Sequence, residues 1–477
     1  MSDCMTVSHR GRRGGTPVSV PTQAPNVAHS GAASAIWVGL LAFLGLLPGS
    51  REGVIHLGGL MMLWREFALI AAAALLLAGA AVWGRPLAVH HGRRGKRLPG
   101  EIWIAVLWTG WVVGRWVGAG RAADVHAVSL LLLNVAAFVI PLWVIHLAAA
   151  AGRLQRLYLW TVVTVIGLLT IYFAESVGLT GFRTDKTIDA WMGVHRLNGP
   201  LSSANNMGAL ILLSLGCCLH RAHERASARR ALWWVATLWL LVLSLMTGSR
   251  GGLAVIFLYV GLLLLAARRI GPMLVLGGAV AMALLLAAQF MSFERYKTTY
   301  EPARWQSYQT AMEGWLSSRG NFWCGFGLGQ VYRWHERELE MLMDRVTPPG
   351  PELLPTPIGE SLSHPHSTVL YLLVETGLVG AALLLWLPVA ESLHGVLAIL
   401  SPLRRDAGPP DLATLAGLAA ACAFPLHLIN TYFLHQYGVS MCAWFLVLIA
   451  RRLRLANAGL ARARFIVRFE AAPEPSR

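Results

Sequence analysis

The stretch ALWWVATLWLLVLSLMTGSRGGLAVIFLYVGLLLLAARR, residues 231–269, holds two apolar runs separated by a short glycine-rich turn. Each run approaches the roughly twenty apolar residues that an α-helix needs to cross a bilayer. A single arginine, Arg250, stands in the turn between them. The stretch therefore predicts two membrane-spanning helices that meet at a tight turn, and it raises the question of what Arg250 does there.

Similar apolar runs recur along the whole chain of 477 residues. Hydrophobic residues make up 56% of it and charged residues only 13%, roughly half the charged fraction of a soluble protein, and the mean hydropathy is +0.55. We therefore predict an all-α polytopic membrane protein with about twelve transmembrane helices. The expected spans are 33–48, 67–83, 101–118, 126–148, 156–178, 204–219, 231–247, 251–267, 272–290, 367–397, 412–430 and 437–451.

The basic residues indicate how these spans are oriented. They gather in every second connection and in both terminal segments, as expected when cytoplasmic loops carry an excess of arginine and lysine, so both termini are predicted to be cytoplasmic. This distribution also accounts for the net charge of +16 without nucleic acid, for which no recognition motif is present. Representative residues of the basic segments are Arg12, Arg94, Arg153, Arg229, Arg268, Arg404 and Arg451.

The expected spans divide the chain into five segments. These are a disordered cytoplasmic tail (1–30), transmembrane helices one to nine (31–290), a long structured outward loop (291–366), helices ten to twelve (367–451) and a basic cytoplasmic tail (452–477). The long loop is expected to contain helices that lie in the membrane interface, because aromatic and apolar residues recur in it at helical spacing. Those residues are Trp305, Tyr308, Met312 and Trp315.

Two further features of the long loop can be interpreted. A second amphipathic segment is expected near 330–345. The sequence GFGLG at 325–329 follows no predicted strand, so it is not a dinucleotide-binding fingerprint, and we interpret it as a flexible hinge.

Arg250 lies on the outward side, where basic residues are depleted. An arginine at a helix end often reaches lipid phosphates, but that is more usual at cytoplasmic ends. Gly251 and its neighbouring glycines would let backbone amides approach a bound group, and the next helix begins there. Amide donors, the positive end of a helix dipole and a guanidinium together favour an anion site, so we expect Arg250 and Gly251 to bind phosphate.

A similar pattern precedes the sixth span, in the sequence HRLNGPLSSANN. It contains Arg196, and Asn205 stands at the helix entry. Asparagine is also an ordinary helix-capping residue, so these residues alone leave a structural role and a binding role open. Arg304, at the edge of the expected interfacial helix, would by itself be a solvated surface charge.

The sequence SHPHS places His364 and His366 directly before Ser367, which is expected to cap the tenth span. Exposure at the surface would explain a lone loop histidine, but a histidine at the outward membrane face can be neutral near pH 7 and accept a proton. No third ligand with suitable spacing accompanies the pair, so no metal site is predicted. Glu375 lies about two turns into the span and is expected to pair with a neighbour in a structural role.

Several of these stretches, taken in order, resemble the O-antigen ligase and polymerase superfamily of bacterial envelope glycan assembly. They are RLNGPLSSANN, TGSRGG, ARWQSYQTAMEGW followed by GFGLG, and HSTVLYLLVETGLVG, and they cover roughly residues 195–380. The resemblance implies a GT-C-like glycosyltransferase in the bacterial inner membrane, with its active site on the periplasmic face. Its donor would be a glycan on undecaprenyl diphosphate, and its acceptor lipid A–core or another glycan.

The same resemblance implies roles for individual residues. Arg196, Arg250 and Arg304 match the arginines that hold the donor diphosphate, and His366 matches the histidine that activates the acceptor hydroxyl. Gly251, Asn205, His364 and Glu375 would support them. Neither a metal nor a cofactor is implied, because guanidinium groups can stabilise a diphosphate leaving group directly. A diphosphate already activates the donor, so we expect direct displacement with inversion at the sugar carbon.

Other functions remain open. The size and position of the 291–366 loop favour a ligase, but a polysaccharide polymerase or a protein O-oligosaccharyltransferase of the same superfamily is an alternative. A transporter or lipid flippase is the alternative from another class. Transporters tend to carry internal repeats and a polar site at the membrane midplane, whereas the unusual polar residues here gather at the outer face.

Overall fold

The computed structural model describes residues 27–46, 54–57, 60–82, 100–118, 125–176, 179, 204–223, 229–247, 249–266, 302–333, 353–401, 410–429 and 437–470. It is about 87% helical, in agreement with the predicted all-α class. The predicted span 272–290 and most of the 179–203 loop, including Arg196, lie outside the described residues.

Helices occupy the other predicted spans. Three of them, α4, α5 and α14, are long and apolar enough to cross a membrane, while the full number of crossings stays a prediction. The helices are α1 (Val27–Leu46), α2 (Trp64–Val82), α3 (Gly100–Gly118), α4 (Val125–Ala150), α5 (Leu154–Ser176), α6 (Ala204–His223), α7 (Arg230–Met246), α8 (Arg250–Ala266), α14 (Thr368–Leu400), α15 (Leu412–Ile429) and α17 (Tyr437–Glu470).

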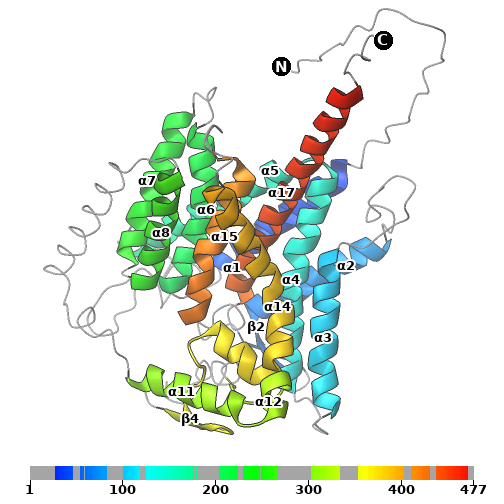
Figure 1. Cartoon of the computed structure of the whole chain (residues 1–477), viewed down its shortest axis with the longest axis vertical. Helices are drawn as coiled ribbons and strands as arrows, with labels where there is room; N and C mark the ends of the chain where they lie inside the picture. The colour runs from blue at the N-terminus through cyan, green and yellow to red at the C-terminus, as the bar shows by residue number, and fades with distance from the viewer. Residues whose placement is uncertain are drawn as a thin grey trace, which may run out of the picture.

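The helices pack side by side around α17, which runs through the bundle and leaves it at one end (Figure 1). Trp37 of α1 stacks on Phe445 of α17, with 4.7 Å between the ring centroids. The indole of Trp37 also donates a hydrogen bond of 2.9 Å to the Thr161 hydroxyl of α5. Between α14 and α15 the backbones touch: a Cβ on Gly395 would lie 2.3 Å from the backbone of Gly417. Small residues at such crossings are typical of helices packed in a membrane.

Several boundaries differ from the expected ones. Helix α1 begins at Val27, inside the predicted disordered tail, and α17 continues to Glu470, so residues 452–470 of the predicted basic tail are helical. Two short hairpins also occur, one pairing β1 (Val54–Leu57) with β2 (Leu60–Leu63) and one pairing β3 (Leu354–Thr356) with β4 (Gly359–Ser361). The first hairpin is understandable from the sequence, because a Gly-Gly pair joins two short apolar runs.

A layer of short elements covers the end of the bundle opposite to the emerging end of α17 (Figure 1). It consists of α11 (Pro302–Leu316), α12 (Arg319–Cys324) and the β3–β4 hairpin. Helix α11 falls where the interfacial helix was predicted, and it buries the small residues Ser307, Ala311 and Gly314. Of the four predicted aromatic and apolar residues, Trp305 and Met312 are exposed, at 53% and 37%, as suits an interfacial helix, whereas Tyr308 and Trp315 are half-buried. The predicted second amphipathic segment lies almost entirely outside the described residues.

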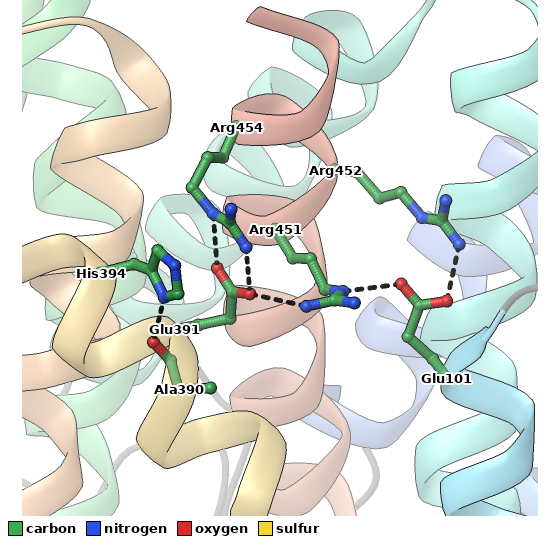
Figure 2. Close-up of polar contacts among 7 residues, drawn as sticks. All are labelled: Glu101, Ala390, Glu391, His394, Arg451, Arg452 and Arg454. Atoms are coloured by element: carbon green, nitrogen blue, oxygen red, sulfur yellow. Dashed lines mark hydrogen bonds and ion pairs between the residues drawn. The ribbon is translucent and has the colours of Figure 1, made fainter. Parts of the chain in front are cut away.

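Toward the emerging end of α17, a ladder of ion pairs ties three helices together (Figure 2). Arg451 of α17 lies between two buried carboxylates, 2.8 Å from that of Glu101 on α3 and 3.0 Å from that of Glu391 on α14. Arg452 extends the ladder on Glu101 at 3.0 Å, and Arg454 extends it on Glu391 at 2.7 Å. Every carboxylate oxygen in this ladder accepts a hydrogen bond from an arginine.

This ladder predicts a stability difference. Replacing Glu391 with alanine leaves Arg451 and Arg454 without their shared carboxylate and should lower the free energy of unfolding by about 2–4 kcal/mol, since both arginines keep some exposure to solvent. The midpoint of thermal unfolding, followed with a thiol-reactive dye on the buried cysteines, measures the effect. Replacing Glu313, which is exposed on α11, is the control. Equal midpoints for the two variants would show that the ion pairs of Glu391 do not stabilise the fold.

Candidate active site

The two predicted histidines lie in the loop between β4 and α14, beneath the α11–α12 layer. The backbone amide of His366 donates to Nδ1 of His364 at 3.2 Å, and the two ring centroids are 3.9 Å apart. His366 has a φ of 47°, the one positive φ among the described non-glycine residues. Such backbone strain persists only where the surroundings enforce it, and it is common at functional sites. Ser367 caps α14 as predicted, because its hydroxyl accepts a hydrogen bond from the Leu370 amide at 3.3 Å.

The surroundings keep both imidazoles neutral. Burial, followed by the charge of Arg304, lowers the pKa of His364 from 6.5 to about 3. The pKa of His366 is also held well below its ordinary value, first by burial and then by His364 and Arg304. His364 is only 7% exposed, whereas His366 is partly accessible from the surface. His366 is therefore the member of the pair that can accept a proton from a bound molecule.

Arg304 joins this pair although it lies about sixty residues earlier in the chain. It stands in the first turn of α11, and α11 is docked on the histidine loop by side-chain hydrogen bonds. The Ser307 hydroxyl lies 2.7 Å from that of Ser361, and the Tyr308 hydroxyl donates to the carbonyl of His366 at 3.3 Å. The structure thus brings a guanidinium and two neutral imidazoles to one place. Arg304 acts on both histidines electrostatically, so it is not the isolated surface charge that it would be by sequence position alone.

Arg250 and Asn205 lie at the starts of two helices that touch. Arg250 opens α8 and Asn205 lies in the first turn of α6; their side chains are outside the described part of the structure. A Cβ on Gly208 would lie 2.8 Å from the Cα of Gly252, so the two helix starts are in close contact. The two N-termini are adjacent, as a shared anion site requires, but binding of phosphate by Arg250 stays a prediction.

One part of the expected anion site has a different role. The Gly252 amide donates to the Ser249 hydroxyl at 3.0 Å, and the Ser249 amide donates to the Thr247 hydroxyl at 3.1 Å. These two amides are therefore engaged within the turn, and Gly252 allows close packing with α6 instead of close approach to a ligand. For Gly251, the second residue of α8, a ligand-binding role stays a prediction, and Gly248 lies outside the described residues.

Glu375 was predicted to pair with a neighbour in a structural role, and its partners in the structure are backbone amides. It is fully buried, and its two oxygens accept hydrogen bonds from Gln330 at 3.1 Å, Val331 at 3.0 Å and Tyr332 at 2.8 Å. These amides belong to the loop that follows α12. The interpretation of GFGLG as a flexible hinge is therefore wrong, because this loop is fixed on α14 at both its ends.

The other end of the loop is fixed by a break in α14 at Gly377, whose φ is 68°. The break frees backbone carbonyls on α14, and the amides of Phe326 and Gly327 donate to those of Val374 and Glu375 at 2.9 and 2.7 Å. Gly377 is also where α14 meets α12, since a Cβ there would lie 2.3 Å from the Trp323 carbonyl oxygen. A deviation from helix geometry in an apolar span is thus compensated by the adjoining loop.

Sequence reasoning missed Arg115, which braces this loop from α3. Its guanidinium donates to the carbonyl of Gly325 at 2.8 Å, one turn from the end of an apolar helix. The sequence offered one signal that could have identified Arg115, because this arginine lies one turn from the outward end of a predicted span. Trp111, one turn earlier on α3, donates its indole N–H to the Thr376 carbonyl at 2.9 Å, so α3 supports both the loop and the backbone of α14 next to the break.

The arrangement suits acid–base chemistry beside a bound anion. A partly accessible neutral imidazole can take a proton, and the neighbouring guanidinium can stabilise negative charge. Within the described residues, no group of three or more histidine, cysteine, aspartate or glutamate side chains is placed to hold a metal ion. The prediction of metal-free chemistry remains to be tested.

The break predicts that Gly377 cannot be replaced. In Gly377→Ala the new methyl group would meet the backbone of α12, and a positive φ costs an additional 1–2 kcal/mol or so. The loop should detach, and trypsin should cleave after the exposed Arg333 several-fold faster than in the wild type. Gly110→Ala in α3, where the methyl group meets nothing within 4 Å, should leave the cleavage rate unchanged. Unchanged cleavage in Gly377→Ala would show that the loop does not depend on the break.

Comparison of the sequence with protein-family models and with curated proteins finds no match. The case for a function therefore rests on the residues described above and on how they are placed.

Proposed function

We propose that this protein is a membrane glycosyltransferase that transfers a glycan from undecaprenyl diphosphate to a sugar hydroxyl at the periplasmic face, most like the ligation of O-antigen to lipid A–core. The observation that carries the proposal is geometric: α11, which contains Arg304 in its first turn, is docked on the loop of the partly accessible His366, whose carbonyl accepts a hydrogen bond of 3.3 Å from the Tyr308 hydroxyl. An anion-binding group beside a proton acceptor is what transfer from a phosphate-linked donor needs.

His366 would act as the general base. Its imidazole takes the proton of the acceptor hydroxyl while the acceptor oxygen forms a bond to the anomeric carbon of the donor sugar. The bond from that carbon to the diphosphate oxygen breaks in the same displacement, so the configuration at the carbon inverts. A positioned base of this kind contributes roughly 10²–10⁴-fold to a rate.

The arginines would hold the leaving group. The bond electrons pass to the diphosphate, whose growing charge is stabilised by Arg304 and, as predicted, by Arg250 and Arg196. Each preorganised donor of this kind is worth on the order of 3 kcal/mol. The adjacent N-termini of α6 and α8, where Asn205 and Gly251 lie, support the placement of a diphosphate there.

A lipid-linked donor also fits the surroundings of the site. Long apolar helices lie on one side of the α11–α12 layer, and the exposed Trp305 and Met312 face of α11 suits the interface. A lipid diphosphate carries its charge at that same depth. This supports the proposal that Arg304 and His366 lie near the donor's phosphates.

The lowered pKa of His366 sets the pH dependence of transfer. The neutral imidazole is the active form, and a pKa below 6.5 keeps it neutral as the pH falls. Between pH 7.5 and pH 5.5 the rate should stay nearly constant, whereas a histidine of ordinary pKa would lose about tenfold. In Arg304→Met the repulsive charge is gone, so the acid limb of the normalised rate profile should move to higher pH. Identical profile shapes for the two proteins would contradict this electrostatic coupling.

Complementation tests the proposed function. In a strain that lacks the chain, lipid A–core without long glycan should accumulate, and the glycan should remain on its lipid carrier. The wild-type protein should restore the ligated glycan, and His366→Ala should not, although it inserts into the membrane normally. Lipopolysaccharide banding on gels gives the result.

Other outcomes of that experiment point to other functions. Lipid A–core that carries a single repeat unit would indicate a polymerase. An unchanged banding pattern in the deletion strain would reject both and direct attention to protein acceptors or to transport. Full restoration by His366→Ala would reject the histidine mechanism.

A further inference from the structure

We propose that Glu375 is a positioning residue of the site: by binding the amides of residues 330–332, its carboxylate fixes where α12 and α11 lie on α14, and so where Arg304 stands relative to His366. The consequence for catalysis rests on the proposed function. The positioning itself can be measured without any transfer assay.

The carboxylate of Glu375 supplies acceptors for three loop amides. Oε1 accepts from Val331 and Tyr332, and Oε2 accepts from Gln330, whose amide also donates to the Gly327 carbonyl at 3.1 Å. The carboxylate is fully buried. An apolar side chain of similar volume would leave the amides of Val331 and Tyr332 without these bonds, at about 1–3 kcal/mol for each one that stays buried. The loop would therefore move away from α14 at this point.

The loop and the two helices before it, α11 and α12, form one unit. The rings of Trp315 on α11 and Phe322 on α12 stack at 4.9 Å, and the Trp315 indole donates to the Phe322 carbonyl at 2.9 Å. Gly325 joins α12 directly to the loop and is also bonded to the Arg115 guanidinium. A displacement of the loop that releases this bond and the bonds of Phe326 and Gly327 to α14 is transmitted through α12 to α11.

The position of α11 determines the environment of the His366 imidazole. The charged and titratable groups known to act on this imidazole are Arg304, from the first turn of α11, and His364, from its own loop. The Tyr308 hydroxyl of α11 reaches its backbone carbonyl. A shift of α11 moves Arg304 away while His364 stays in place.

Matched variants of one helix separate positioning from general loss of stability. Glu375→Met removes the acceptor but keeps the volume, and Glu375→Gln retains one carbonyl oxygen for Val331 and Tyr332. Glu391→Met is the control, because Glu391 is also buried in α14 but lies about 24 Å further along it.

The first readout is a distance between spin labels on the full-length protein in lipid nanodiscs. Labels are placed at the exposed positions Met312 on α11 and Trp386 on α14, in a background without Cys4 and Cys324. We expect a narrow distribution for the wild type and for Glu391→Met, and a shifted or broadened one for Glu375→Met, with Glu375→Gln between them. A wild-type distribution in Glu375→Met, or an equal change in Glu391→Met, overturns the proposal.

The second readout follows His366 itself. Diethyl pyrocarbonate modifies neutral imidazoles, and mass spectrometry gives the rate at this residue at pH 7.5 and pH 5.5. The rate should change little in the wild type and fall several-fold at pH 5.5 in Glu375→Met, toward the roughly tenfold fall of an ordinary histidine. A changed label distance without this fall overturns the link to Arg304. A tenfold fall in the wild type would instead reject the neutral base of the proposed function, and the label distances would still decide the positioning.

Discussion

A helix that breaks inside an apolar bundle must find partners for the backbone groups it exposes, and the end of this protein that carries α11 and α12 is organised around that requirement. The break at Gly377 divides α14, and the freed carbonyls are bonded by the 325–332 loop and by the indole of Trp111. In return, the carboxylate of Glu375 satisfies the amides of the same loop. The carbonyls of α14 and the amides of the loop thus find hydrogen-bond partners in one contact, which an unbroken helix could not make.

This exchange makes the outer layer part of the bundle. Helix α12 has no buried residue, and the residues that α11 buries are small. The position of the two helices depends on directional bonds to α14 and to the β3–β4 hairpin. Directional bonds define a geometry more narrowly than apolar contact does, which suits a site where an arginine and a histidine from distant parts of the chain must face each other.

The sequence was sufficient for the parts of the molecule that depend on local patterns. Hydropathy located the helices, helical spacing located α11, and a serine before an apolar run located the cap of α14. Non-local contacts were not readable in this way. Nothing in the spacing of Arg304 and His366 indicates that they meet, because their approach depends on the hairpin and the loop. The packing role of Gly252 could not be predicted, because a helix neighbour such as Gly208 cannot be recognised from the sequence. The fixed position of the GFGLG loop could not be predicted either, because its partner, Glu375, lies about fifty residues away.

The ion-pair ladder at the other end of α3, α14 and α17 gives its arginines two successive tasks. Before the helices assemble, Arg451, Arg452 and Arg454 are positive charges directly after an apolar segment, and such charges influence the orientation in which a segment inserts. Once the three helices have assembled, the same guanidinium groups are bound to Glu101 and Glu391. Glu101 on α3 therefore gains its ion pairs only when α17 packs against it, although Arg451 lies 350 residues later in the chain. This end of the bundle thus depends on a contact between two segments that are synthesised far apart.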